Sequence, residues 1–285
     1  MGGKVRGFDG RCSKARVRGK ILLSFDIEEF DLPREHGEEI SLEEGLKVSA
    51  EGLKRILKTL NETNVKVTFF CTGNFAEGRP ELVNEIVEGG HEIACHGVDH
   101  FKPMASDVKK SKKIVEKVAG VKVRGYRQPR MQKIDYEELK RCGYKYDSSM
   151  NPAFIPGRYN NLKVPKKPFM RGGVLEIPVS VVTFMRVPMF WLALHLFPKK
   201  IYYRLARMCV KRDGYFATYF HPWEFADLVG FAVVPGYIKK NSGVKLVKRL
   251  HGLIDNLKAA GYDFVTYGKF GEEWLELKEE NEREI

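Results

Sequence analysis

Two pairs of polar residues, each directly after an apolar run, have the types and spacing needed to bind a metal ion or transfer a proton. His96 and His100 stand four residues apart in "HGVDH", after the run "HEIAC". If the intervening residues turn helically, both imidazoles lie on one face and can bind one ion. Asp26 and Glu28 are two residues apart in "FDIEEF", so on a strand they share a face while Glu29 points the other way.

Together the two pairs offer a ligand set for a transition metal. Two neutral imidazoles and one carboxylate suit zinc or another first-row divalent metal, with open positions for water and substrate. Asp26 is then free to accept a proton from water. The plainer alternative is a chance His-x3-His spacing beside carboxylates that cap helices or lie on the surface. We favour the metal site because both pairs fall at strand ends that a barrel brings together.

Two further strand ends carry residues of the same kind. Arg127 follows a strand in "RGYRQPR" and His221 follows another in "TYFHPWEF". A histidine at the rim of a site is a candidate proton donor near neutral pH, and an arginine can hold a carboxylate ionised. Taken alone, a structural ion pair explains Arg127 equally well, and a hydrogen-bonded rim histidine explains His221.

The elements that position these residues alternate between short apolar runs and amphipathic segments. Strands are expected at residues 21–25, 66–72, 91–95, 121–126, 144–149, 174–182, 215–220 and 262–267, and helices around residues 46–60, 80–88, 108–118 and 246–257. Seven or eight strand–helix units predict a closed parallel barrel rather than an open doubly wound sheet, and no glycine-rich fingerprint follows the first strand. Residues 151–173 are rich in Pro, Gly and Asn and predict a long loop, which in a compact domain is usually functional.

Charge is unevenly distributed along the 285 residues. The formal net charge is +12, and residues 1–20 hold seven Lys or Arg against Asp9 alone, half of the excess. A basic arm can meet nucleic acid, anionic lipid or an acidic substrate, or it can be a solvated, flexible terminus. Because no recognition motif accompanies it, we expect no nucleic-acid partner. We therefore expect a basic arm at residues 1–19, a barrel at 20–272 and an acidic tail at 273–285.

Three further features bear on the compartment. No segment has the pattern of a secretory signal, and the longest apolar run, residues 187–198, is too short to span a bilayer. That run predicts a buried helix, a substrate lid or an interfacial segment. The five cysteines show no CxxC spacing, which favours reduced thiols in a cytoplasmic protein over a cysteine-bound zinc site. Peripheral contact with the inner membrane surface is a further expectation from the basic arm and the apolar run.

The motifs of this sequence resemble those of a known family. The run "VTFFCTGNFAEGRPELVNEIVEGGHEIACHGVDH" is similar to the polysaccharide deacetylase family (NodB homology, carbohydrate esterase 4), and the resemblance continues through "GYRQPR", "GYKYDSSMNP", "LEIPVS" and "YFHPWEF". It covers Gly19 to Phe270 with the motifs in the family's order. It implies a distorted (β/α)7 barrel with one divalent metal, usually zinc, that removes acetyl groups from sugars. The later motifs look closest to members associated with exopolysaccharide and lipid-linked glycan pathways.

The resemblance also implies roles for particular residues. Asp26 matches the family's catalytic base, and Arg127 the arginine that orients it. His221 matches the histidine that acts as the family's catalytic acid, and Asp147, in "YDSS", matches the aspartate that pairs with that histidine. His96 and His100 match the two histidine ligands. The family's first motif usually has adjacent aspartates, the second being a ligand, whereas here Ile27 follows the base and Glu28 fits a variant in which the ligand comes two residues later.

These matches predict a metal-dependent carbohydrate N-deacetylase. Metal-assisted amide hydrolysis would use Asp26 as the base toward water and His221 as the acid toward the departing amine. The expected substrate is an acetylated sugar or a lipid-linked glycan. One alternative is an amide hydrolase acting on a ureide or another small linear or cyclic amide. Another is a metal-free glycan-binding barrel without catalysis, which is considered because Ile27 stands where the family usually has its ligand aspartate.

Overall fold

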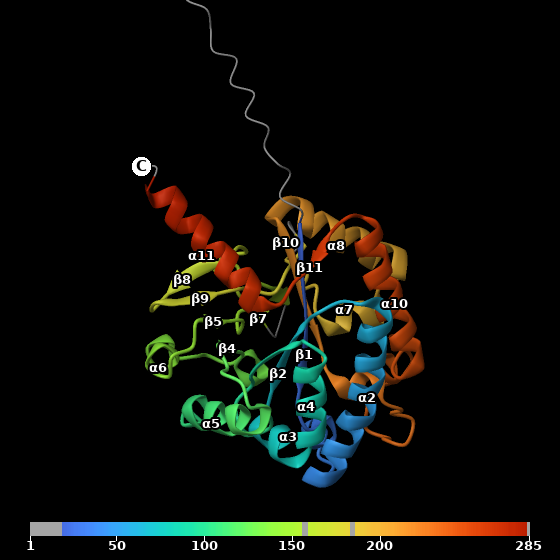
Figure 1. Cartoon of the computed structure of the whole chain (residues 1–285). Coiled ribbons are helices and arrows are strands. Elements are labelled where there is room, and N and C mark those ends of the chain that lie inside the picture. Colours follow the sequence, from blue (N-terminus) through green and yellow to red (C-terminus); the bar gives the residue numbers. More distant parts are fainter. Residues whose placement is uncertain (1–18, 156–158, 183–185, 284–285) are drawn as a thin grey trace, which may run out of the picture.

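The computed structural model describes residues 19–155, 159–182 and 186–283, and its centre is a curled sheet of short strands wrapped by helices (Figure 1). The strands of the main sheet are β1 (Lys20–Ile27), β2 (Thr68–Cys71), β3 (Glu92–Cys95), β4 (Gly125–Tyr126), β5 (Tyr146–Asp147), β8 (Phe169–Arg171), β9 (Val174–Glu176), β10 (Tyr215–Phe220) and β11 (Asp263–Phe264). Eight of these nine strands follow the order of the eight expected runs, and the ninth, β8, lies in the segment expected to be a loop.

The sheet follows the order β10-β1-β2-β3-β4-β5-β9-β8. Every pairing from β10 to β9 is parallel, and β11 also pairs in parallel with the start of β1, so eight strands run in one direction. Strand β8 joins β9 in the antiparallel sense. Beyond β9 the chain returns to β10, where Ser180 N donates to Ala217 O at 3.0 Å. The ring is therefore closed by this contact rather than by a full strand ladder, which is how it differs from the closed barrel expected from the alternation.

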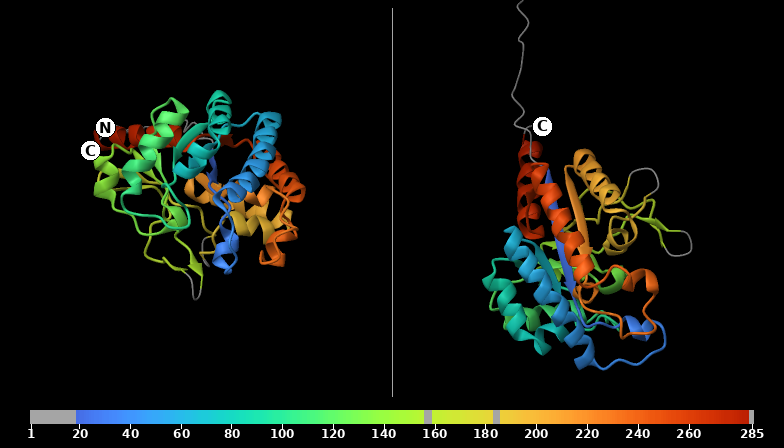
Figure 2. Two further views of the ribbon diagram at one scale, coloured as in Figure 1. Left: turned by 90° about the horizontal axis from the view of Figure 1, so that it is seen from below. Right: turned by 90° about the vertical axis from the view of Figure 1, so that its right-hand side faces the viewer.

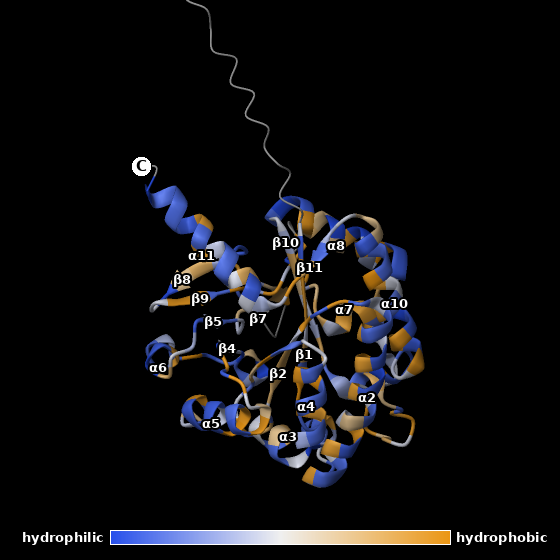
Figure 3. Cartoon of the chain, in the orientation of Figure 1, coloured by the Kyte–Doolittle hydropathy of each residue, from blue (hydrophilic) through white to orange (hydrophobic). Residues whose placement is uncertain are grey.

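Helices cover the outside of the sheet, as Figure 2 shows from two further directions. They are α1 (Leu32–Glu35), α2 (Leu42–Thr63), α3 (Gly73–Gly78), α4 (Pro80–Glu88), α5 (Asp107–Ala119), α6 (Tyr136–Arg141), α7 (Trp191–Leu196), α8 (Lys199–Asp213), α9 (Gly236–Lys239), α10 (Val244–Ala259) and α11 (Tyr267–Arg283), with 3-10 turns η1 (Pro129–Met131) and η2 (Pro222–Phe225). The longer ones are hydrophobic on one side and polar on the other (Figure 3), so each buries one face against the strands.

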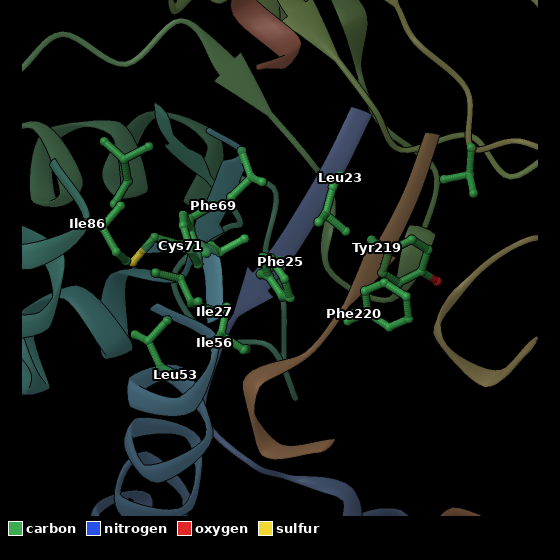
Figure 4. Close-up of a cluster of buried hydrophobic side chains, with 14 of the residues drawn as sticks. Leu23, Phe25, Ile27, Leu53, Ile56, Phe69, Cys71, Ile86, Tyr219 and Phe220 are labelled. Carbon is green, nitrogen blue, oxygen red and sulfur yellow. The ribbon is translucent and has the colours of Figure 1, made fainter. Parts of the chain in front are cut away.

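Strand β1 shows why the site residues face the barrel interior. Leu23, Phe25 and Ile27 point outward into a core shared with α2, α4 and β2, where Figure 4 places Leu53 and Ile56 beside them. Because side chains alternate along a strand, the residues between them point inward: Leu22 near the start, then Ser24, then Asp26. The interior thus changes from apolar to acidic toward the C-terminal end of the strand.

Several segments differ from the sequence expectations. The long loop contains β8 and a small hairpin of β6 (Phe154–Ile155) and β7 (Tyr159–Asn160). The boundary expected between residues 272 and 273 falls inside α11, because Tyr267, Phe270 and Gly271 anchor that helix in the barrel and its acidic end continues it. The basic arm lies outside the described residues except for Gly19. Among the residues the structure describes, no helix is both long and apolar enough to cross a bilayer.

Candidate active site

Three side chains from two strand ends meet around one buried carboxylate oxygen. Glu28 Oε2 lies 3.3 Å from His96 Nε2 and 3.2 Å from His100 Nε2. All three residues are buried, and their ligand atoms lie within 4.8 Å of one another. Glu28 Oε2 makes no hydrogen bond within the described part of the chain. A buried carboxylate oxygen without a partner is costly, so its position between two imidazole nitrogens fits a cation that these groups would share.

The far sides of both imidazoles are held by hydrogen bonds. His96 Nδ1 lies 2.8 Å from Arg127 O, and His100 Nδ1 lies 2.8 Å from Asp31 Oδ2. A proton on each Nδ1 leaves both Nε2 atoms facing Glu28, which is the usual outer support of a histidine metal ligand. Burial opposes protonation of His100, but Glu28 and Asp31 outweigh it and raise the pKa of His100 to about 9. A metal ion must therefore compete with a proton at this histidine.

The prediction of a helical turn between His96 and His100 is wrong. Residues 97–100 form an irregular loop in which Gly97 has a φ of +69°, a value open to glycine without strain. The loop is fixed by the start of α3, since Gly73 N and Asn74 N donate to Gly97 O and Val98 O. The imidazole rings stack with their centroids 5.6 Å apart. The spacing of four residues thus brings the pair together through a turn at glycine, not through a helix.

Glu28 and Glu29 separate as the strand alternation predicts. Glu28 shares the inward side with Asp26 and is held by Trp223, whose Nε1 donates to Glu28 Oε1 at 3.2 Å. Glu29 turns away and accepts hydrogen bonds from Thr72 Oγ1, Asn74 Nδ2 and the backbone N–H of His100. Glu29 therefore braces the loop that carries His100 rather than joining the three clustered side chains.

Asp26 is paired with a fully buried arginine. Arg127 Nη1 donates to Asp26 Oδ1 at 2.5 Å, and the other donors of the guanidinium reach Ser24, Ser148 and Tyr267. All five donors of the arginine are used, so the cation is fixed in position. Burial alone would raise the pKa of Asp26, but Arg127, with two nearby histidines, outweighs it and holds that pKa below the ordinary value. Asp26 Oδ2 lies 3.9 Å from His96 Nε2, beside the metal-ligand candidates.

His221 stands at the end of β10, on the opposite side of the same cluster. Its Nε2 lies 3.9 Å from Glu28 Oε1, and its ring stacks on Trp223 at a centroid distance of 5.1 Å. Its Nδ1 lies 2.9 Å from Glu224 Oε1, while Glu224 Oε2 lies 2.8 Å from His195 Nε2. Burial would lower the pKa of His221, but Glu28 and Glu224 outweigh that effect and raise it.

The pairing of Asp147 with His221 expected from the resemblance is corrected by the structure. Asp147 ends β5 in register with Glu176 of β9, so it shares a hydrogen bond with Glu176 and accepts two from Ser149. Glu224 takes the position beside His221 instead, because η2 folds it back three residues after the histidine. The spacing of His221 and Glu224 in "HPWE" is the sequence signal for this pair, whereas no comparable signal marks Asp31 or His195.

One pocket collects five of the seven predicted site residues. It has a volume of about 260 Å³ and is lined by Asp26, Glu28, His96, His100 and His221, together with aromatic residues that include Trp191, Tyr219, Trp223 and Tyr237. Arg127 lies behind Asp26 with no exposure, and Asp147 is buried away from the pocket. The arrangement places a candidate base, a candidate acid and a three-residue cation site around one space.

Comparisons with known proteins agree with this geometry. The profile of the family described as Polysaccharide deacetylase matches residues 19–146. Over these residues the chain is similar to the polysaccharide deacetylase family. A peptidoglycan deacetylase of Helicobacter pylori is 32% identical over 122 residues, covering 39% of this chain and 42% of that protein. A peptidoglycan deacetylase-like protein of Gibberella zeae is 30% identical over 155 residues, covering 48% and 46%. The chain thus spans less than half the length of these curated relatives.

Solved structures extend the likeness to the whole barrel. A Mycobacterium smegmatis protein assigned to the polysaccharide deacetylases superposes with a TM-score of 0.66 at 20% identity and covers 93% of both chains. A carbohydrate esterase 4 pseudoenzyme from Bacillus anthracis superposes with a TM-score of 0.51 at 13% identity, covering 89% of this chain and 66% of that one. The distorted barrel of the polysaccharide deacetylases is therefore confirmed for this chain. At such identities the likeness concerns the fold alone.

Proposed function

We propose that this protein is a metal-dependent hydrolase that removes the acetyl group from an N-acetylated sugar or glycan. The observation that carries the proposal is the convergence of Asp26, His221 and the Glu28–His96–His100 cluster on one pocket. A divalent cation such as zinc, held by those three ligands, would supply Lewis-acid activation of water and of the acetyl carbonyl. The relatives named as peptidoglycan deacetylases support a sugar substrate for this chain.

The protein's own residues divide the proton transfers between them. Asp26, kept ionised by Arg127, accepts a proton as water adds to the acetyl carbon. His221, whose raised pKa favours the protonated form, donates a proton to the sugar nitrogen as the C–N bond breaks. The products are acetate and a sugar amine. Glu224 and His195 hold the donor ring in place behind the pocket.

Acetate release from N-acetylglucosamine oligomers by the zinc-loaded protein tests the proposal directly. Asp26→Asn and His221→Ala should each lower kcat by at least about 100-fold, the usual contribution of a general base or acid. Asp255→Asn changes an exposed carboxylate on α10 and should have no effect. Full turnover in Asp26→Asn would refute the assigned base. Hydrolysis of a ureide but of no acetylated sugar would favour the alternative amide hydrolase, and binding of sugar without turnover would favour the non-catalytic barrel.

We also propose that the pocket opens toward an anionic membrane surface on the cytoplasmic side. Leu196, Val229 and Tyr237 expose 53%, 79% and 52% of their surface, and Tyr237 also lines the pocket. Lys199 and Lys200 begin α8, and Lys239 and Lys240 lie at the end of α9, where they would complement anionic lipid. Helices α7 and α9 pack together, which brings the elements that carry Leu196 and Tyr237 side by side. A lipid-linked glycan would present its sugar at this position.

One observation supports the cytoplasmic location, and one assay tests the membrane contact. Cys71 and Cys95 lie in register on neighbouring strands, are buried and are not bonded to each other, as expected in a reducing compartment. Val229→Asp should reduce co-sedimentation with vesicles containing phosphatidylglycerol, whereas Val121→Asp, an exposed control beyond the end of α5, should not. Equal co-sedimentation with neutral and anionic vesicles would argue against the proposal.

A further inference from the structure

A second pocket adjoins the first and has a different chemical character. It has a volume of about 280 Å³, and Met131 lines both pockets. Gln128 lines the first pocket and Ser149 lines the second. A hydrogen bond between them, in which Gln128 N donates to Ser149 Oγ at 2.8 Å, links the two sides of the wall that separates the pockets. Each volume lies just below the range of about 300–1,000 Å³ typical of ligand sites, and the two together lie within it.

The backbone at the junction is strained. Arg130 and Met131 are consecutive non-glycine residues with φ values of +59° and +51°. Such conformations cost about 1–3 kcal/mol each and persist mainly at ligand-binding and catalytic positions. Here they turn the chain so that Arg130 lines the first pocket and Met131 both. The strain therefore coincides with the point where a ligand occupying both pockets would cross.

The second pocket carries two cations among neutral polar and apolar side chains. Lys133 and Arg171 both line it, and no Asp or Glu does so among the described residues. Neither cation has a carboxylate within ion-pair distance in the described part of the chain; Arg171 instead lies over the ring of Tyr136 at 4.9 Å. Two acids, Asp135 and Glu137, border an adjoining hollow with both cations but form no ion pair with either, and Asp135 Oδ1 instead accepts from Glu137 N and Glu138 N. An anion entering the second pocket would therefore meet two cations that are not paired with a carboxylate in the described part of the chain.

A buried amide supplies an independent sign of a ligand. Asn151 lines the pocket and is 4% exposed, yet its Oδ1 has no hydrogen-bond partner within the described residues. Asn161 from the same loop fixes the backbone by donating from Nδ2 to Asn151 O at 2.8 Å. Buried polar atoms without partners are uncommon, and an amide beside a pocket is a natural partner for a sugar hydroxyl. The long loop that the sequence marked as functional thus lines this second pocket.

We infer that the second pocket binds an acidic sugar unit, bearing a carboxylate or a phosphate, next to the acetylated sugar held in the first pocket. Lys133 and Arg171 would contact the anionic group, and Asn151 a hydroxyl of the same unit. The inference rests on the proposed function for the occupant of the first pocket. It makes the preferred substrate an anionic glycan rather than a neutral polymer of N-acetylglucosamine.

Binding measurements test this independently of turnover. Calorimetry on the zinc-loaded protein would compare a glucuronyl-N-acetylglucosamine disaccharide with neutral N,N′-diacetylchitobiose. We expect the acidic disaccharide to bind at least about tenfold more tightly, and Lys133→Gln or Arg171→Gln to remove about tenfold of that affinity while leaving the neutral one unchanged. Both side chains are exposed, so the variants should fold. Lys110→Gln, an exposed lysine on α5 outside both pockets, is the matched control.

The outcomes separate the inference from the proposed function. Equal affinity for the two disaccharides, no binding of either at millimolar concentration, or equal losses in Lys110→Gln and Arg171→Gln would overturn the inference. Tighter binding of N-acetylglucosamine 1-phosphate than of the uronate, lost in the same variants, would identify phosphate as the anionic group. Selective binding without acetate release would support the second pocket as a site for an acidic sugar and would refute the deacetylase proposal instead.

Discussion

The support of His100 by Asp31 gives the sharpest test of the metal site, because no sequence motif pointed to it. The two groups are buried and lie 2.8 Å apart, and burial of Asp31 is outweighed by this hydrogen bond, which lowers the pKa of Asp31. Removing an outer partner of a histidine ligand typically weakens metal binding about 10- to 100-fold. Asp31→Asn should therefore weaken zinc binding by about 1.4–2.7 kcal/mol while leaving all three ligands present.

The effect can be read as thermal stabilisation by zinc. At free zinc about 100 times Kd, the wild type gains about 2.7 kcal/mol, or roughly 5–11 °C in Tm for a chain of this size. At the same zinc concentration Asp31→Asn should gain only about 0.4–1.4 kcal/mol, or roughly 1–6 °C. Each variant is compared with its own baseline in chelator, so a general loss of stability is subtracted.

Two matched variants complete that experiment. Glu28→Gln should lose most of the zinc-induced shift, because it removes a ligand oxygen rather than its support. Asp255→Asn, which changes an exposed carboxylate, should keep the full shift. If Asp31→Asn showed the same zinc-induced shift as the wild type, the geometric reasoning about the outer hydrogen bonds would be refuted. If Glu28→Gln kept it as well, the three-ligand site would be wrong.

Three further predictions follow from the buried charges. Asp26→Asn should destabilise the fold by about 3–5 kcal/mol in urea unfolding, because it leaves Arg127 buried without its carboxylate; a loss below about 1 kcal/mol would contradict this. Zinc affinity should fall about tenfold per pH unit below the pKa of about 9 at His100, measured by chelator competition, whereas a flat profile would show that no proton is displaced. Burial and Asp147 raise the pKa of Glu176 in the folded protein. The stabilisation that the protonated Glu176 provides is therefore complete below the pKa of this residue in the unfolded chain, and it is lost as the pH rises through its pKa in the folded protein. The stability of the wild type relative to Glu176→Gln should therefore decline as the pH rises above the ordinary glutamate pKa of about 4.3, by up to about 1.4 kcal/mol per unit, and a constant difference would disprove it.

Much of the barrel could be predicted from local pattern, because each strand is a short apolar run and each polar site residue follows one. The helices at Leu42–Thr63 and Val244–Ala259 carry a regular apolar stripe and were found where the spacing indicated. Helix α8 was not predicted, since its apolar positions are interrupted by six Lys or Arg and its buried face is set by contact with β10. Within the run at residues 187–198, α7 is confirmed as a partly buried helix.

The inner part of the site was predictable and its outer part was not. His96, His100, Asp26 and Glu28 sit next to strands in the sequence, and parallel strands bring such positions to one end of a barrel. The supporting residues come from turns whose path depends on tertiary contacts. Asp31 reaches His100 across 69 positions of the chain, a pairing that no local periodicity encodes.

The Asp–Ile–Glu pattern in β1 follows from the same geometry. Ile27 is still paired with Cys71 of β2 and is fully buried in the outer core, so a carboxylate at that position would face apolar side chains. The next inward position is Glu28, just beyond the strand, and its extra methylene lets Oε2 reach both imidazoles while Oε1 accepts from Trp223. The departure from adjacent aspartates therefore keeps a carboxylate at the candidate cation site by placing it one residue further along the chain. Since a pseudoenzyme shares this fold, it is this cluster and the Asp26–Arg127 pair, rather than the barrel, that argue for catalysis.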